Sequence, residues 1–189
     1  MARPAEPGRR ALLDAGAALL GDPGGPSLAG MSVNAVVARA GMSKGAFYQH
    51  WKDRGAFLVA LHRRFHDELQ AAVMDAVRDL SPGLPRLTAG LTAYLDGCLA
   101  SPEARALLFQ ARHDGALTPE VEARNAAFTA VAEPDLILLG WQPPAAAASL
   151  LIAMAVHIAA IENAIRAPRP DLRETVAAFL RRGPEAGDG

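Results

Sequence analysis

The feature that most constrains this chain is the stretch 32–51, SVNAVVARAGMSKGAFYQHW, where two short helical patterns flank one glycine. The first begins after Ser32, a residue type that caps helices, and its apolar residues recur at i, i+3, i+4 and i+7. Gly41 ends this helix, and Ser43 caps a second one, which buries Phe47 and Trp51. Two helices joined by a glycine turn form a helix-turn-helix, whose second helix fits the major groove of DNA.

The rest of the chain predicts an all-α fold. Aromatic residues are only 5% of the 189 residues and no hairpin signal occurs, which disfavours a sandwich or barrel. Helical periodicity and the positions of Gly and Pro predict about nine helices, at 9–20, 32–40, 43–51, 53–80, 84–99, 102–113, 119–139, 144–166 and 171–182. We expect an N-terminal three-helix head with the helix-turn-helix, followed by a larger helical body.

Charge is divided between these two parts. Residues 1–64 carry nine Lys or Arg against four Asp or Glu, whereas residues 65–189 carry ten against sixteen. A basic head on an acidic body indicates a polyanionic partner for the head alone. The single cysteine, Cys98, excludes a disulfide framework and a multi-cysteine zinc site.

The run 40–51, AGMSKGAFYQHW, resembles the signature A-G-V-S-K-G-[TS]-[LF]-Y-x-H-F of TetR/AcrR-type transcriptional repressors. The resemblance covers about residues 9–69, and the long helix after the motif and the length near 190 also fit. The chain departs from the family at Trp51 (usually Phe), Gln49 (often aromatic), Arg54 (usually Lys) and Gly55 (often Glu). The resemblance implies a DNA-binding domain at 9–69 and a ligand-binding and dimerisation domain at 70–182.

The family's DNA contacts carry over by register. Phosphate-positioning roles fall on Ser32, Ser43, Tyr48, His50, Lys52 and Arg54, and base-facing roles fall on Lys44, Gly45, Ala46 and Gln49. Asn34 faces out and can touch either phosphate or base. By its chemistry Gln49 can pair with adenine and Lys44 with guanine, at about 1–3 kcal/mol each. A solvated face of an ordinary three-helix bundle would also carry such polar residues, and packing explains His50 equally well.

The last two long helices are expected to form a homodimer interface, as in the family, because helix 144–166 shows seam spacing. The seam residues are Leu151, Met154, Ile158, Ile161, Ile165, Leu172, Val176 and Phe179. A purely intramolecular core is the alternative. A dimer is favoured because one small head reads too few base pairs, whereas a two-fold dimer reads two operator half-sites about 34 Å apart, or a multiple of that.

The resemblance also implies a pocket for a small-molecule effector inside the body. The candidate lining residues are Tyr94, Cys98, Phe109, His113, Phe128, Trp141, Met154 and His157. Each of them is equally consistent with ordinary core packing. The scarcity of buried-looking charge predicts a largely apolar effector, which would release the operator by favouring a different conformation of the body.

Other classes of function find little support. His62 and His66 are four residues apart, but the HExxH pattern of zinc hydrolases is missing, and we predict no metal, cofactor or catalytic group. Helix 144–166 resembles a membrane span, but its alanines and prolines favour a buried helix, so we expect no membrane partner and a cytoplasmic protein. The competing interpretation is a small helical ligand-binding or enzyme domain whose head does not bind DNA. Sequence does not separate a repressor from an activator, nor does it identify the effector, the operator or the regulated genes.

Overall fold

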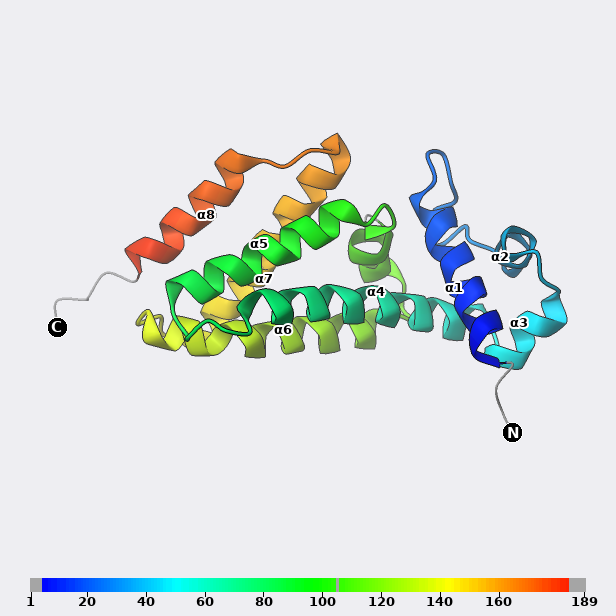
Figure 1. Ribbon diagram of the computed structural model, residues 1–189, viewed down its shortest axis with the longest axis horizontal. Coiled ribbons are helices and arrows are strands. Elements are labelled where there is room, and N and C mark those ends of the chain that lie inside the picture. Colours follow the sequence, from blue (N-terminus) through cyan, green and yellow to red (C-terminus); the bar gives the residue numbers. More distant parts are fainter. Residues whose placement is uncertain (1–4, 105, 184–189) are drawn as a thin grey trace. The chain divides into compact units, whose positions relative to one another are not determined.

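The computed structural model describes residues 5–104 and 106–183, and its elements in that part of the chain are helices (Figure 1). The α-helices are α1 (Ala5–Gly21), α2 (Val33–Ala40), α3 (Lys44–His50), α4 (Arg54–Val77), α5 (Leu84–Ala100), α6 (Thr118–Leu138), α7 (Pro144–Ile165) and α8 (Pro170–Arg182). The all-α prediction is confirmed, and the bounds of α2, α5, α7 and α8 lie within one residue of those expected.

The helix expected at 102–113 is not a regular α-helix. It consists of a π-helical turn, Ala106–Gln110, followed by a 3-10 turn, Ala111–His113. Its inner residues are buried, and the side chain of Gln110 accepts a hydrogen bond from the backbone N–H of Leu28, at 2.5 Å. Partners far away in the sequence therefore shape this segment, which explains why a local helical pattern did not predict its form.

The chain divides into two compact units, which are described separately. The first unit extends to His66 and also includes residues 101–121, and the second consists of 67–100 and the residues from 122 onward. Residues 101–121 were expected in the body, and they group with the helix-turn-helix in the structure. The contacts responsible include the pair Arg63–Glu120, with Nε to Oε2 at 2.9 Å.

In the first unit α1 packs against α2 and α3, and large apolar side chains fill the space between them. Phe47, Phe57 and Leu12 are fully buried there. Gly16 allows α1 to approach α4 closely, because a Cβ at this position would lie 2.7 Å from the ring of Phe57. These contacts fix the helix-turn-helix on a rigid base.

In the second unit α7 packs against α5, and α8 contacts both. A buried ion pair joins these helices: the carboxylate of Glu162, fully buried on α7, accepts hydrogen bonds from Nε and Nη2 of Arg173 on α8, both at 2.7 Å. Arg173 also pairs with Asp96 on α5 at 2.6 Å. Its Glu162 hydrogen bonds are the main reason that the pKa of Arg173 is raised above its ordinary value.

Candidate nucleic-acid interface and effector cavity

The turn between α2 and α3 is built by short-range capping. The Oγ of Ser32 accepts the N–H of Ala35, and the Oγ of Ser43 accepts the N–H of Ala46, each at 3.1 Å. Gly41 adopts a left-handed conformation with φ of 65°, which L side chains rarely adopt. These three residues set where each helix begins and ends, so the angle between the helices follows from local sequence.

The two sides of α3 have different roles. Phe47 faces inward, with its ring centroid 5.5 Å from that of Trp51 and 5.3 Å from that of Phe57. On the other side Lys44, Gly45 and Gln49 are exposed, and 54% of Tyr48 is accessible. The aromatic cluster therefore holds α3 in place while its polar side is left open to a partner.

The remaining predicted DNA contacts differ in exposure. Ser32, Asn34, Ser43 and Lys52 are exposed, and Ala46, His50 and Arg54 are half-buried. The ring of His50 lies edge-on to Trp51, with centroids 5.5 Å apart, so His50 also packs against the aromatic cluster. The exposed side of α3 and the start of α2 thus carry most of the predicted contacts.

Arg54 is turned toward the protein's own backbone. Its Nε donates to the carbonyl of Met31 at 2.6 Å, and its Nη2 donates to the carbonyls of Leu28 and Ala29, at 2.5 and 3.0 Å. The guanidinium therefore holds the loop before α2 against the first turn of α4. The sequence did not indicate this bracing role, because every residue has a backbone carbonyl and the residue types therefore do not show which carbonyls Arg54 contacts.

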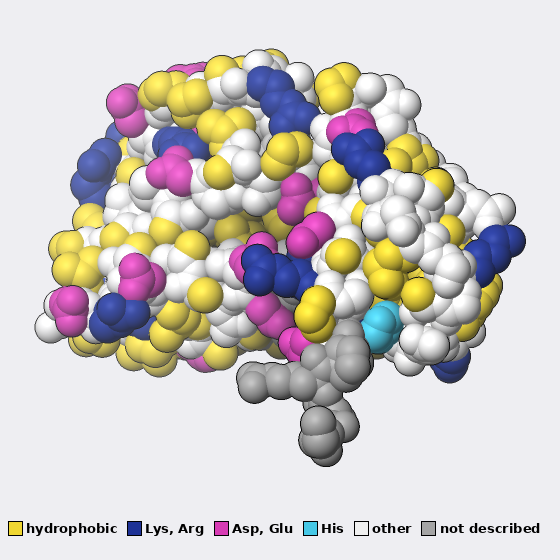
Figure 2. All heavy atoms as spheres, turned by 45° about the vertical axis from the view of Figure 1, so that its right-hand side comes forward, with side chains coloured by type: hydrophobic (Ala, Val, Ile, Leu, Met, Phe, Trp, Pro, Cys, Tyr) yellow, Lys and Arg dark blue, Asp and Glu magenta, His cyan; other side chains and the backbone are white. Residues whose placement is uncertain are grey.

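Most arginines of the first unit have internal partners. Arg39 pairs with Asp22 at 2.7 Å, Arg64 pairs with Asp14 at 2.6 Å, and Arg63 pairs with Glu120. Both lysines of this region, Lys44 and Lys52, are exposed, and 83% of the Lys52 side chain is accessible. Figure 2 shows acidic and basic side chains interspersed over one face of the molecule, with Lys and Arg projecting at its right-hand edge. The positive charge available to a polyanion is therefore concentrated on a few side chains.

Residues 12–61 match the family model of bacterial regulatory proteins, tetR family. Residues 12–61 therefore form a tetR-family domain. Members of this family are DNA-binding transcription regulators rather than enzymes, and they respond to small-molecule ligands. We find no match among curated proteins.

Solved structures share the fold of this chain over nearly its whole length. A transcriptional regulator from Rhodococcus sp. Rha1 is 21% identical, with a TM-score of 0.74 over 92% of this chain and 94% of that one. A putative transcriptional regulator from Pseudomonas aeruginosa PAO1 is 21% identical, with a TM-score of 0.74 over 95% and 90% of the two chains. AibR in complex with isovaleryl coenzyme A and operator DNA is 19% identical, with a TM-score of 0.69 over 90% and 96%.

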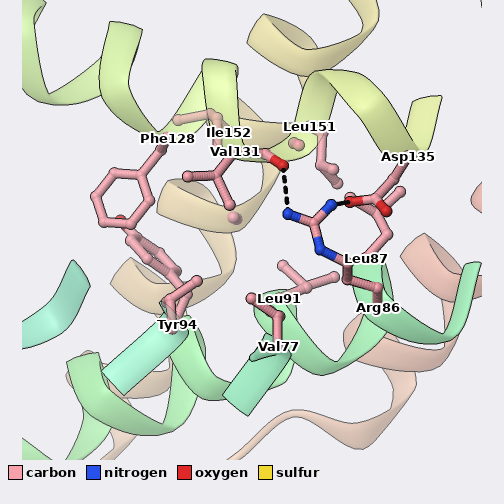
Figure 3. Close-up of a pocket in the computed structure, with 14 residues that line it drawn as sticks. Val77, Arg86, Leu87, Leu91, Tyr94, Phe128, Val131, Asp135, Leu151 and Ile152 are labelled. Atoms are coloured by element: carbon pink, nitrogen blue, oxygen red, sulfur yellow. Dashed lines mark hydrogen bonds and ion pairs between the residues drawn. The ribbon is translucent and has the colours of Figure 1, made fainter. Parts of the chain in front are cut away.

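The second unit contains a cavity of about 50 Å³ between α4, α5, α6 and α7 (Figure 3). Its walls are mostly aliphatic, and Tyr94 and Phe128 meet edge-to-face at one end, with ring centroids 5.4 Å apart. At the other end Nη1 of Arg86 donates to Oδ2 of Asp135 at 2.8 Å, and the N–H of Gly83 donates to Oδ1 at 2.7 Å. The cavity therefore combines an apolar interior with one buried ion pair.

Two of the eight predicted pocket residues, Tyr94 and Phe128, line this cavity. Trp141, Met154 and His157 instead line an open groove between α7 and α8. Phe109 and His113 lie in the irregular segment grouped with the first unit, where His113 is exposed. Phe109 and His113 are not among the residues that line this cavity or this groove, and their role in a pocket stays a prediction.

Cys98, the remaining candidate, is fully buried on α5. Burial raises the pKa of its thiol to about 12, although a hydrogen bond with Tyr94 lowers it in part. At neutral pH the group is a protonated, inaccessible thiol, which fits a packing role.

Sequence reasoning missed Arg86 and Asp135. One signal was available: Asp135 follows Phe128 and Ala132 by seven and three residues, so it shares their helical face. All three side chains are buried, and Asp135 is 2% exposed. A carboxylate on the buried face of an amphipathic helix requires a partner, and Arg86 supplies it.

The predicted dimer residues fall into two sets. Leu151, Ile158 and Val176 are buried within the protomer and also line the groove between α7 and α8. Ile165 and Phe179 are about half exposed, and Met154, Ile161 and Leu172 are half-buried. The exposed side of α7 also includes Leu150, of which 67% is accessible.

By length and composition α7 could cross a membrane, since its most apolar window has a mean hydropathy of 2.0. A third of that window is buried inside the structure. The predicted seam residues Met154, Ile161 and Ile165 share a helical face with Leu150, and their role in a dimer stays a prediction.

Proposed function

We propose that this chain is a cytoplasmic, homodimeric repressor that binds an operator with two half-sites and leaves it when a small, largely apolar effector enters the body. The observation that carries the DNA-binding part is the outward side of α3. Lys44, Tyr48 and Gln49 are exposed there, on a helix whose other side is fixed by a buried aromatic cluster.

In this proposal Lys44, Gly45, Ala46 and Gln49 face base edges. Ser32, Ser43, Tyr48, His50 and Lys52 position phosphates, and Asn34 takes either role. Arg54 acts by holding the loop before α2, which sets the position of the helix-turn-helix as a whole. Gly45 lets the helix approach DNA closely, because it has no side chain.

The dimer brings two heads to one operator. The exposed apolar side of α7, around Leu150 and Ile165, together with Phe179 on α8, forms the contact surface. The family resemblance supports this assignment.

Release is a shift between two conformations. An effector that enters the cavity presses on Val73 and Val77 of α4, the helix whose first turn carries Arg54. To change occupancy from 99:1 to 1:99, the effector must bind the released conformation about 10⁴-fold more tightly than the operator-bound one.

The test begins by enriching a pool of random duplexes on the purified chain. We expect a two-fold symmetric sequence, bound with an affinity that falls steeply with salt. A double variant, Lys44→Ala with Tyr48→Ala, is expected to lose at least about tenfold in affinity for that sequence. Arg78→Ala, which removes an exposed cation from the second unit, serves as the matched control and should bind normally.

Two results would contradict the proposal: an unenriched pool, or a folded double variant that binds like the wild type. The sign of regulation is read from a reporter whose promoter carries the enriched sequence. Reduced expression supports a repressor, whereas increased expression identifies an activator.

A further inference from the structure

The cavity of the second unit contains two charged side chains among its lining residues, and they lie together. Arg86 and Asp135 occupy one end, while Tyr94 and Phe128 occupy the opposite end, with Val77, Leu91 and Val131 between them (Figure 3). A ligand that fills this space therefore meets a polar group at one end and hydrocarbon along the rest of its length.

The two charges are not equivalent as partners for a ligand. Each oxygen of Asp135 already accepts a hydrogen bond, from Gly83 and from Arg86, and 2% of its side chain is accessible. Arg86 makes two hydrogen bonds within the described residues, to Asp135 at 2.8 Å and to the carbonyl of Val131 at 3.4 Å. A guanidinium has five N–H groups, so Arg86 can take another acceptor without giving up its pair.

The second hydrogen bond of Arg86 is also the weaker one. Its length of 3.4 Å is at the upper limit for an N–H donor, so exchanging the carbonyl of Val131 for a charged oxygen is favourable. A cation at the same end would lie beside Arg86 and be repelled by it. The geometry therefore favours an anionic head group.

The size of the cavity adds a further condition. It measures about 50 Å³, whereas pockets for drug-sized ligands run to roughly 300–1,000 Å³. A ligand with an alkyl chain must part the helices that line the cavity, and α4 is one of them. Binding in this place is therefore coupled to a change in the body.

We propose that the effector is an amphipathic carboxylate whose anionic head pairs with Arg86 and whose alkyl chain enters the cavity toward Tyr94 and Phe128. The proposal rests on the assignment of the body as the effector-binding part under Proposed function. It sharpens the expectation of a largely apolar effector by adding one negative charge at a defined end.

The experiment compares three probes of equal chain length: octanoate, 1-octanol and octylamine. Binding to the DNA-free protein is measured at pH 7 by titration calorimetry and by the thermal unfolding midpoint. We expect octanoate to bind once per chain, at least about tenfold more tightly than the alcohol or the amine, and to raise the midpoint.

The decisive variant is Arg86→Met with Asp135→Asn, which removes both charges together and leaves no buried ion unpaired. It should bind octanoate no better than 1-octanol, whereas Arg78→Met, a control that removes an exposed cation of the same unit, should keep the wild-type preference. If circular dichroism shows that the double variant does not fold, Arg86→Lys replaces it. That variant keeps the cation and should weaken octanoate several-fold without reversing the preference over octylamine.

Three results would overturn the proposal: tighter binding of octylamine, octanoate binding that survives loss of Arg86, or no octanoate binding by the wild type. All are read without DNA, so they are distinguishable from a failure of operator binding. Octanoate is then added to the operator complex, where release supports the effector role and continued binding contradicts it.

Discussion

The helix-turn-helix and helix α7 show two different relations between sequence and structure. In the first, each boundary has a local cause: Ser32 and Ser43 cap the two helices, and Gly41 makes the turn. In α7 both sides are apolar, so the position of the helix depends on what surrounds it. Local capping and turn residues therefore specify the helix-turn-helix, whereas tertiary contacts specify the position of α7.

This difference explains why function was readable in one region and not in the other. DNA recognition by a helix-turn-helix uses exposed residues at fixed positions of a rigid motif, so register alone points to them. The cavity that we propose for the effector is formed by side chains from several helices, namely α4, α5, α6 and α7. Only the packing shows which of them meet.

The largest expected effect concerns a tertiary contact of the body. Glu162→Ala should lower the free energy of unfolding by about 3–5 kcal/mol, since Arg173 loses a buried partner and the backbone N–H of Arg169 loses its acceptor at 2.8 Å. Urea unfolding followed by circular dichroism measures the loss. Glu174→Ala, at an exposed site on α8, is the control and should change it by less than about 0.5 kcal/mol.

A second variant tests whether the lower stability of Glu162→Ala arises from the unpaired charge of Arg173. Replacing Glu162 and Arg173 together by leucine should recover most of the stability, because buried ion pairs are often replaceable by apolar residues. A Glu162→Ala protein within about 1 kcal/mol of the wild type would show that the pair does not hold α8 in place.

The contrast between local and tertiary determinants also decides which features of the fold could be predicted from the sequence. The helix bounds were predictable because caps, prolines and glycines act over a few residues: Asp53, for example, was expected to open the fourth helix, and its Oδ1 accepts the N–H of Ala56 at 2.7 Å. The bracing role of Arg54 and the π-turn at Ala106–Gln110 were not predictable. Both depend on partners more than twenty residues away, such as Leu28, which contacts Arg54 and Gln110.

The exposed side of α7 gives the next prediction. Leu150→Glu should turn the proposed dimer into a monomer, raising the dissociation constant at least about 100-fold, because a charge would be buried at an apolar contact. Sedimentation velocity measures the mass, and Met74→Glu, an exposed apolar site on α4, is the matched control. The opposite outcome is that Leu150→Glu stays dimeric while a folded Leu151→Glu is monomeric. The dimer interface would then include Leu151, as the helical spacing of the sequence predicts.

The smallest expected effect concerns Gly41, which makes the turn of the helix-turn-helix. Gly41→Ala should destabilise the protein by about 1 kcal/mol, since φ of 65° is strained for a residue with a Cβ. Nothing lies within 4 Å of a Cβ at this position, so the strain comes from the backbone alone and no clash adds to it. Gly41→Asn tolerates the left-handed conformation better and should recover part of the loss, as measured by urea unfolding. Equal stability of the Ala and Asn variants would mean that the turn is held by the packing around it. The head would then depend on tertiary contacts as α7 does.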